Sequence, residues 1–394
     1  MRLLPSIRMI RSQEKTAICL KLCPGIAVFL FLAACSPSGP APDLFALPVT
    51  YSVGKKPAAL KARDMNNDGF PDILVCNSGS NTLNFFEALG DGTFKTAFTM
   101  NTGREPVALD TGDFNGDGIP DIAISNYGDG DISIILGQKD GVFKLKTNVK
   151  VGRLPIAVAA GDFNNDEKLD LAVTLRFDKL VILLGIGDGT FKPAEAYQAS
   201  GTPAYMTAGD FNGDNNLDLA VAFNAVQVNF IRIFHGNGDG TLKNPVRVAG
   251  GGQSSFITQY DINQDGKNDL LSSSTMKDVI KIFINQGKGT FTALADAAAE
   301  KGPEYIVPGN FTGDRIPDLA VANRRDASIS VLQGRGDGTF IFPHFNYPVG
   351  ANPRAMTGAD FNDDGLTDLA LLLYDRQRLE ILLRKFGSPE PIDP

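Results

Sequence analysis

The stretch that decides the fold reads Asp113-Phe114-Asn115-Gly116-Asp117-Gly118-Ile119-Pro120-Asp121. It places three carboxylates and one amide at positions 1, 3, 5 and 9 of a nine-residue loop, with a glycine at position 6. Oxygen ligands at every second residue suit Ca2+, which takes six to eight oxygens at about 2.3–2.6 Å. A glycine with positive φ lets the chain turn back around an ion, and position 7 is expected to offer its backbone carbonyl. The stretch therefore predicts a calcium-binding loop.

Copies of this loop recur at a nearly constant spacing. They begin at Asp64, Asp113, Asp162, Asp210, Asp261, Asn310 and Asp360, so the steps are 49, 49, 48, 51, 49 and 50 residues. A regular period of about 20–50 residues is the signature of solenoids, propellers and arrays. Each repeat packs only on its neighbours in such folds, so a chain of 394 residues needs no single large core.

Each repeat contains four short runs that are typical of strands. In the second repeat these are 106–111, 121–125, 132–136 and 142–151, separated by clusters rich in Gly, Asp and Asn. No stretch has a sustained helical period. A Gly-Asp-Gly-Thr-Phe turn follows the third run at 90–94, 187–191 and 336–340, and Asp-Gly between runs is a hairpin signal. Four short strands per repeat predict an all-β fold in which each repeat is one propeller blade.

The two ends of the repeat region complement each other. The seventh repeat stops after its third run, 379–383, while an extra run at 47–53 precedes the first loop and resembles the fourth run of other repeats. We therefore expect a seven-bladed β-propeller of four-stranded antiparallel blades, whose N-terminal strand closes the last blade. This closure removes exposed sheet edges.

Together, the Asp-x-Asn-x-Asp-Gly-x-x-Asp loops, the flanking strands and the Gly-Asp-Gly-Thr-Phe turns resemble FG-GAP/VCBS repeats. These repeats occur in the seven-bladed propellers of integrin α subunits and in many secreted bacterial proteins. The resemblance covers residues 45–386. It implies a propeller and Ca2+ binding but no single function, because the family includes adhesion modules, lectins and domains attached to enzymes.

The resemblance implies about six structural Ca2+ sites, made by side chains at positions 1, 3, 5 and 9 and a carbonyl at position 7. The expected ligands are Asp64, Asn66, Asp68, Phe70 and Asp72; Asp113, Asn115, Asp117, Ile119 and Asp121; Asp162, Asn164, Asp166, Lys168 and Asp170; Asp210, Asn212, Asp214, Asn216 and Asp218; Asp261, Asn263, Asp265, Lys267 and Asp269; and Asp360, Asn362, Asp364, Leu366 and Asp368.

The sixth loop departs from this pattern. It begins at Asn310, has two carboxylates and carries Arg315 in the glycine position, so we expect it to bind Ca2+ weakly or not at all, with the charge of Arg315 in place of the ion. Glu167 and Asn215 occupy the glycine position of the third and fourth loops. Asn tolerates positive φ, whereas Glu167 predicts local strain.

Residues 1–34 are typical of a bacterial lipoprotein signal peptide. The run 26–34 is apolar but too short to span a bilayer, and it ends in Leu32-Ala33-Ala34-Cys35, which resembles a lipobox. The basic residues that precede the run are Arg2, Arg8, Arg11, Lys15 and Lys21. Cys35 is the expected lipidation site, and the alternative is an ordinary secretory signal with an incidental cysteine.

This assignment divides the chain into four parts. Residues 1–34 are the signal peptide, 35–44 the lipidated cysteine and a Pro-rich tether, 45–386 the propeller and 387–394 a C-terminal tail. We expect a monomer anchored by lipid in the cell envelope, at the outer membrane.

The net charge of −8 mostly reflects the loops. The segment before Cys35 carries five basic residues and one acidic residue, so its removal leaves −8 − 4 = −12, which six Ca2+ ions would neutralise. An acidic chain argues against nonspecific nucleic-acid binding, which needs a basic surface.

No catalytic constellation is recognisable in the sequence. His235 and His344 lie outside any triad or metal-binding spacing, and there is no nucleophile elbow or phosphate loop. We therefore expect a binding or adhesion propeller that recognises a protein or polysaccharide. A polysaccharide-active hydrolase or lyase is the alternative.

The ligand is expected on the propeller face that varies in sequence. The loops between second and third strands share this face with the connections between blades, while the calcium loops and Gly-Asp-Gly-Thr-Phe turns share the other. The variable face has a surplus of basic residues, which suits an anionic partner, although solvated loop charge is the alternative. The candidate contacts are Arg324, Arg325, Arg354 and Arg376, with Tyr127, Tyr205, Tyr305 and Tyr374 in or near the same face.

Overall fold

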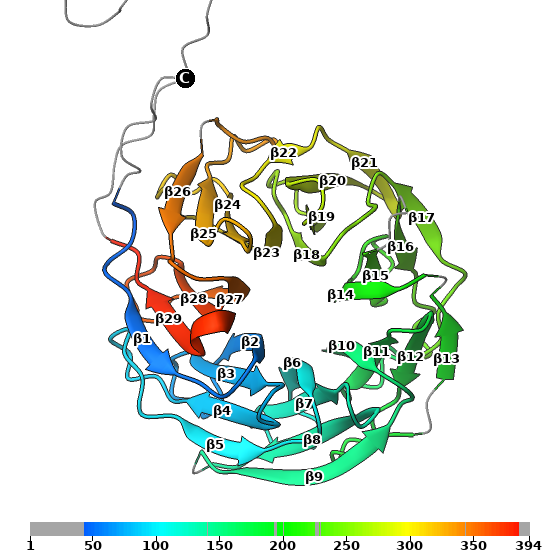
Figure 1. Cartoon of the computed structure of the whole chain (residues 1–394). Coiled ribbons are helices and arrows are strands. Elements are labelled where there is room, and N and C mark those ends of the chain that lie inside the picture. The colour runs from blue at the N-terminus through cyan, green and yellow to red at the C-terminus, as the bar shows by residue number, and fades with distance from the viewer. Residues whose placement is uncertain are drawn as a thin grey trace, which may run out of the picture. The chain divides into compact units, whose positions relative to one another are not determined.

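The computed structural model describes residues 43–385, apart from residues 140, 193–194, 200, 225–227, 229 and 343. The predicted signal peptide, the lipidation site Cys35 and the C-terminal tail lie outside the described residues. Within them, seven antiparallel sheets follow one another around a ring (Figure 1). This part of the chain contains no helix that is long and apolar enough to cross a membrane.

Each sheet is one blade and has an inner, a second, a third and an outer strand, named here in that order. Blade one contains β2 (Pro57–Arg63), β3 (Asp72–Asn77), β4 (Thr82–Phe86) and β5 (Phe98–Asn101); blade two contains β6 (Pro106–Gly112), β7 (Asp121–Asn126), β8 (Asp131–Gly137) and β9 (Phe143–Lys150). Blade three contains β10 (Pro155–Gly161), β11 (Asp170–Leu175), β12 (Lys179–Leu183) and β13 (Glu195–Gln198); blade four contains β14 (Pro203–Gly209), β15 (Asp218–Phe223), β16 (Phe230–Phe234) and β17 (Val246–Ala249).

The remaining blades follow the same plan. Blade five contains β18 (Phe256–Tyr260), β19 (Asp269–Ser274), β20 (Val279–Gly287) and β21 (Thr290–Ala293), with a short extra strand, β22 (Ala297–Ala298), that also pairs with β20. Blade six contains β23 (Pro303–Gly309), β24 (Asp318–Asn323), β25 (Ser328–Leu332) and β26 (Phe345–Pro348). Blade seven contains β27 (Pro353–Ala359), β28 (Asp368–Leu373), β29 (Arg378–Leu382) and β1 (Val49–Ser52), with a 3-10 turn, η1 (Tyr374–Arg376), between β28 and β29.

The predicted ring closure is confirmed. Strand β1 pairs antiparallel with β29, with Val49 opposite Ile381 and Ser52 opposite Arg378. The hydroxyl of Tyr51 accepts a hydrogen bond from the Phe94 amide of blade one at 2.9 Å. The N-terminal strand therefore joins the last blade to the first, as the extra run before the first loop predicts.

The second strand of every blade is buried along its whole length. All residues of β3, β7, β11, β15, β19, β24 and β28 are buried. Each blade packs its two faces against neighbouring blades, so both faces of these strands are buried, and most of the strands are largely apolar between a first Asp and a last polar or apolar residue. Strand β19 instead carries three buried serines. The outermost strand β1, by contrast, alternates between half-buried and exposed residues.

Aromatic side chains pack at the seams between blades. Phe94, in the turn of blade one, contacts Phe361, in the loop of blade seven, with ring centroids 5.5 Å apart. Phe114 of blade two and Phe191 of blade three meet in the same way at 5.9 Å. These edge-to-face pairs stabilise the seams beyond the area that they bury.

A first prediction concerns the segment that closes the ring. Phe45 is 6% exposed and packs against Phe311 and Tyr347 of blade six. Phe45→Ala should lower the free energy of unfolding by about 3–5 kcal/mol, because it leaves a cavity at this seam. Leu47→Ala is the matched control: Leu47 is 91% exposed, so its loss should change stability by less than about 0.5 kcal/mol. Denaturant unfolding of both variants tests this, and equal effects would contradict it.

Candidate functional site

The backbone of each candidate calcium loop wraps around the carboxylate at position 1. In blade two, Asp113 Oδ1 accepts hydrogen bonds from the amides of positions 3, 4 and 5 at 2.7–3.3 Å. Its other oxygen accepts one from Gly118 at 2.8 Å. Asp117 Oδ1 in turn accepts from the amide of Ile119 at 2.9 Å. The loop is therefore shaped by its own carboxylates.

Two positions of the loop adopt a left-handed backbone. Position 6 has φ of 80° at Gly118, 65° at Glu167 and 67° at Arg315. The sequence pattern predicts this conformation there, and Glu167 and Arg315 adopt it despite their side chains, which is unfavourable by about 1–2 kcal/mol. Position 4 also has positive φ, with 75° at Gly116 and 58° at Asp363. The enrichment of Asn, Asp and Gly at position 4 is the signal that could have revealed this second turn.

The aspartate at position 9 joins the loop to the end of the third strand. Asp121 is fully buried, and its two oxygens accept hydrogen bonds from the amides of Phe114 at 2.8 Å and Gly137 at 2.9 Å. Burial is the main cause that raises the pKa of Asp121 to about 6. The hydrogen bonds from the two amides lower this pKa, and the charges of Asp117 and Asp113 raise it. The same pair of contacts is made by Asp72, Asp170, Asp218, Asp269, Asp318 and Asp368.

The donor chemistry of the loops fits Ca2+. In blade seven, Asn362 Oδ1 is buried and has no hydrogen-bond partner among the described residues, while its amide nitrogen donates to Asp364 at 3.0 Å. A buried acceptor left unpaired costs about 1–3 kcal/mol, and a cation would satisfy it. In the described part of the chain, no group of three or more His, Cys, Asp or Glu side chains is arranged to hold a metal.

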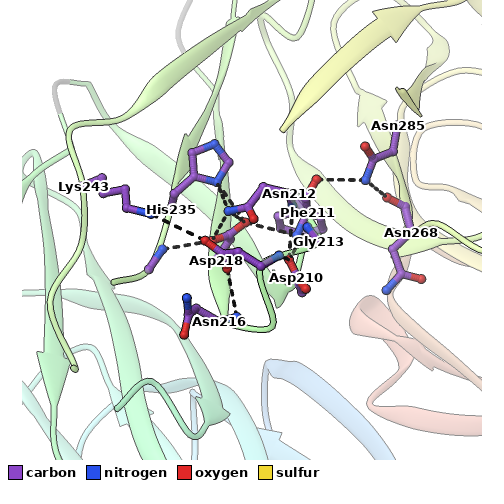
Figure 2. Close-up of polar contacts among 12 residues, drawn as sticks. Asp210, Phe211, Asn212, Gly213, Asn216, Asp218, His235, Lys243, Asn268 and Asn285 are labelled. Carbon is purple, nitrogen blue, oxygen red and sulfur yellow. Dashed lines mark hydrogen bonds and ion pairs between the residues drawn. The ribbon is translucent and has the colours of Figure 1, made fainter. Parts of the chain in front are cut away.

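The loop of blade four has nitrogen donors beside its carboxylates (Figure 2). His235 Nδ1, at the end of β16, lies 2.9 Å from Asp218 Oδ2, and Asn212 Nδ2 lies 3.2 Å from the same oxygen. Lys243 Nζ lies 3.5 Å from Asp214 Oδ2. The sequence places His235 outside any triad or metal-binding spacing. The structure gives it a specific role, since it pairs with a candidate ligand of this loop.

The polar groups of the blade-six loop pair with one another and with side chains from outside the loop. Thr312 Oγ1 donates to Asp318 at 3.0 Å, and Gln333 Nε2 lies 3.3 Å from Asp314 Oδ2. The guanidinium of Arg384, which is 4% exposed, donates to the carbonyl of Phe311. Burial lowers the pKa of Arg384, and nearby groups that include Asp318 oppose this. The buried arginine beside this loop is thus Arg384, which follows β29, whereas the predicted Arg315 is exposed.

A second contact between blades links several of the loops to the turn of the next blade. The amide of Gly92 donates to the carbonyl of Phe361, and Gly189 donates to Phe114 in the same way, both at 2.9 Å. Blade five lacks this turn sequence, and Asn285 Nδ2 donates instead to the Phe211 carbonyl at 3.1 Å (Figure 2). The predicted proximity of the turns to the calcium loops is therefore confirmed.

The opposite face contains a pocket of about 1170 Å3. It lies where the inner strands begin, because its lining includes Ala58 of β2, Val107 of β6, Ile156 of β10, Ala204 of β14 and Glu304 of β23. We call it the axial pocket, since six of the seven inner strands contribute to it together with loops between second and third strands. Its charged and tyrosine residues are Lys56, Arg104, Glu105, Tyr127, Arg176, Tyr205, Glu304, Tyr305, Arg324, Arg354 and Tyr374.

The four arginines predicted to bind a partner have different surroundings. Arg324 and Arg354 line the axial pocket, where each forms an ion pair with Glu304. Arg325 lies outside the pocket lining and contacts Asp278, and it also donates to the carbonyl of Thr275 at 2.7 Å. Arg376, in η1, does not line the pocket either. The structure thus brings together two of the four arginines.

Glu304 organises the polar side of the pocket. Its side chain is 12% exposed and lies between Arg354 and Arg324, whose Nη1 atom is 3.5 Å from Oε2. Burial raises the pKa of Glu304, whereas the charges of Arg354 and Arg324 oppose this. The four tyrosines assigned to or near the variable face all line the same pocket. Sequence reasoning did not identify Glu304 as part of the site, because its importance comes from arginines 20 and 50 residues away.

Comparisons with known proteins identify the repeat. A family model described as an FG-GAP-like repeat matches residues 64–124, 113–173, 162–221, 210–272, 261–321 and 310–371. No curated protein matches the chain.

Solved structures share the fold at low sequence identity. BBS1N, in its complex with ARL6DN, has a TM-score of 0.64 and 12% identity over 89% of this chain and 99% of that chain. Virginiamycin B lyase from Staphylococcus aureus has a TM-score of 0.58 and 15% identity over 85% and 98%. Hydrazine synthase from Kuenenia stuttgartiensis has a TM-score of 0.60 and 12% identity over 89% and 98%. These similarities concern the fold alone, and two of the three proteins are named as enzymes.

A second prediction separates the hydrogen-bonding role of position 9 from any metal role. Without metal, Asp121→Asn should lower the free energy of unfolding by about 1–3 kcal/mol, because an amide nitrogen cannot accept one of the two buried backbone hydrogen bonds. Asp117→Asn, in the same loop but exposed, should change it by less than about 0.5 kcal/mol. Urea unfolding in excess chelator measures both, and equal losses would refute the role of Asp121.

Proposed function

The chain belongs to the FG-GAP-like repeat family, and we propose on this premise that it is a calcium-stabilised binding protein of the cell envelope. Its propeller fold suggests a binding or adhesion function. The observation that carries the proposal is the axial pocket, a concave site of about 1170 Å3 lined by the starts of six inner strands and by loops of the same face. Pockets with a few convergent polar groups are the usual places where ligands bind.

The calcium loops would serve the structure rather than the ligand. When bound, Ca2+ supplies positive charge among clustered carboxylates, and binding to the native state stabilises that state. Asp121 and its equivalents already join each loop to the third strand through two amides. The inner strands begin at the axial pocket and end at these loops. A fixed loop therefore keeps the pocket residues in place from the opposite face.

The polar groups of the pocket favour binding over turnover. Glu304 pairs with Arg324 and Arg354, and these two charges support its ionised form against the effect of burial. A carboxylate held in this way orients the two guanidinium groups toward a ligand. We propose an anionic partner, protein or polysaccharide, that is bound without chemical change by a monomer anchored at the outer membrane through Cys35.

The third prediction concerns the metal. Equilibrium dialysis should give about six Ca2+ ions per chain, and chelation should lower the melting temperature. Asp364→Asn removes a candidate ligand and should reduce the count by about one, since Ca2+ sites depend on their charged ligands. The control Asp363→Asn makes the same change at a neighbouring exposed residue of the same loop and should leave the count unchanged. A chain that binds no Ca2+ would refute this part of the proposal.

The fourth prediction concerns the ligand. An array of envelope proteins and polysaccharides, probed with the Ca2+-loaded protein, should show saturable and selective binding. The bound material, recovered and analysed by mass spectrometry, should be unchanged. Shortened or unsaturated polysaccharide products would instead indicate a hydrolase or lyase. The absence of any binding by folded, Ca2+-loaded protein would refute the proposed function.

A further inference from the structure

We propose that the axial pocket binds a carboxylated sugar residue of an acidic polysaccharide, and that Arg324 and Arg354 hold its carboxylate. The inference rests on the proposed binding function and adds the site, the ligand class and the residues that recognise it. Three features of the pocket lead to this proposal: its positive charge, the N–H groups that Arg324 and Arg354 still have free to donate, and the polar and aromatic groups around these arginines.

The pocket is positively charged on an acidic protein. Its lining carries five cationic side chains and two anionic ones. Arg104 is neutralised by Asp129, with Nε 2.6 Å from Oδ1, so the local surplus is 5 − 2 − 1 = 2 positive charges. The whole chain has a net charge of −8. A concave site of opposite sign to its surroundings concentrates ligands of the complementary charge, which here are anions.

The two arginines keep unused hydrogen-bonding capacity. A guanidinium has five N–H groups, and each arginine contacts Glu304 through its Nη1 atom. Within the described residues, neither side chain makes another ion pair, and the exposed fractions are 41% for Arg324 and 37% for Arg354. The planar fork of arginine matches a carboxylate in a bidentate way. Glu304 is a positioning residue, because it holds the guanidinium groups of Arg324 and Arg354 at the wall of the pocket.

The surroundings of the arginines suit a sugar ring. Tyr205 and Tyr305 line the pocket, and their rings pack on Phe256 with centroids 4.5 and 4.6 Å from its own, so the pocket lining includes an aromatic cluster. Burial raises the pKa of Tyr305 to about 12, so its hydroxyl stays protonated at neutral pH.

Polar side chains complete the lining. Hydroxyl and amide groups both donate and accept hydrogen bonds, as sugar hydroxyls require, and the pocket presents them from Ser78, Asn81, Thr202, Asn224 and Ser255. Usual small-molecule pockets measure about 300–1,000 Å3. At about 1170 Å3, this one has room for more than one sugar ring.

Calorimetric titration with matched oligosaccharides tests the ligand class. The probes are tetrasaccharides of galacturonate, mannuronate and guluronate, a glucuronate-containing tetrasaccharide, and the methyl ester of each. We expect saturable binding of at least one acid, and binding of its methyl ester at least about tenfold weaker, because esterification removes the charge and keeps the rings. Polyglutamate serves as the acidic peptide probe.

Variants of the arginines test the site. Arg324→Ala and Arg354→Ala should each weaken binding of the preferred acid at least about tenfold. Arg354→Lys keeps the charge beside Glu304, so it protects the fold, yet it should also weaken binding because lysine lacks the planar fork. The matched control is Arg325→Ala, which alters the adjacent arginine outside the pocket lining and should leave the affinity within about twofold.

The outcomes separate this inference from the proposed function. Equal binding of acid and ester, or full affinity in the Arg324 and Arg354 variants, would overturn the inference but leave a binding propeller. Binding of polyglutamate alone would replace the sugar by an acidic peptide and likewise overturn it. The inference also fails if none of the uronate oligosaccharides binds. In that case, selective binding of another protein or polysaccharide of the envelope array would still support the proposed function.

Discussion

A buried aspartate at the end of each loop is the contact on which the architecture depends. Asp121 accepts one hydrogen bond from its own loop and one from the end of the third strand, and the same contacts recur in every blade. A buried carboxylate without partners would be strongly unfavourable, so these two amides make the position possible. They also set the distance between the first two strands of a blade and the third. The shape of the loop, with its clustered oxygens, follows from this anchor.

The ring is held together by contacts that each blade makes with the next. Phe361 illustrates this, since its ring packs on Phe94 and its carbonyl accepts the amide of Gly92. Where the turn sequence is missing, a side chain takes its place, as Asn285 does in blade five and Arg384 does after β29. Strand β1 completes blade seven by pairing with β29, and its Tyr51 hydroxyl accepts a hydrogen bond from Phe94 of blade one. Because every seam is occupied, the loops of the opposite face are free to differ without loss of the fold.

The two faces of the propeller therefore carry side chains of different charge. The loop face concentrates carboxylates, which favours a structural cation over an anionic ligand. The opposite face gathers basic and aromatic side chains around the axis, with Glu304 between Arg324 and Arg354. Positive potential in a concave site on an acidic protein attracts anions to one place. This separation lets the protein keep its stabilising charge away from its proposed ligand.

The sequence by itself determined the number of blades, the order of strands, the loop positions and the closure by residues near Val49, because each of these depends on a local pattern repeated at a fixed period. It also placed Arg324, Arg354 and the four tyrosines on or near one face. Only the tertiary structure decided which of these side chains meet. Tyr205 and Tyr305 are far apart in the chain, yet both pack on Phe256. His235 reaches Asp218, and Arg384 reaches the loop of blade six. The contacts of Tyr205, Tyr305 and Arg384 depend on how neighbouring blades pack around the ring, which a repeat pattern does not specify. The contact of His235 lies within blade four and depends on the side-chain geometry after β16.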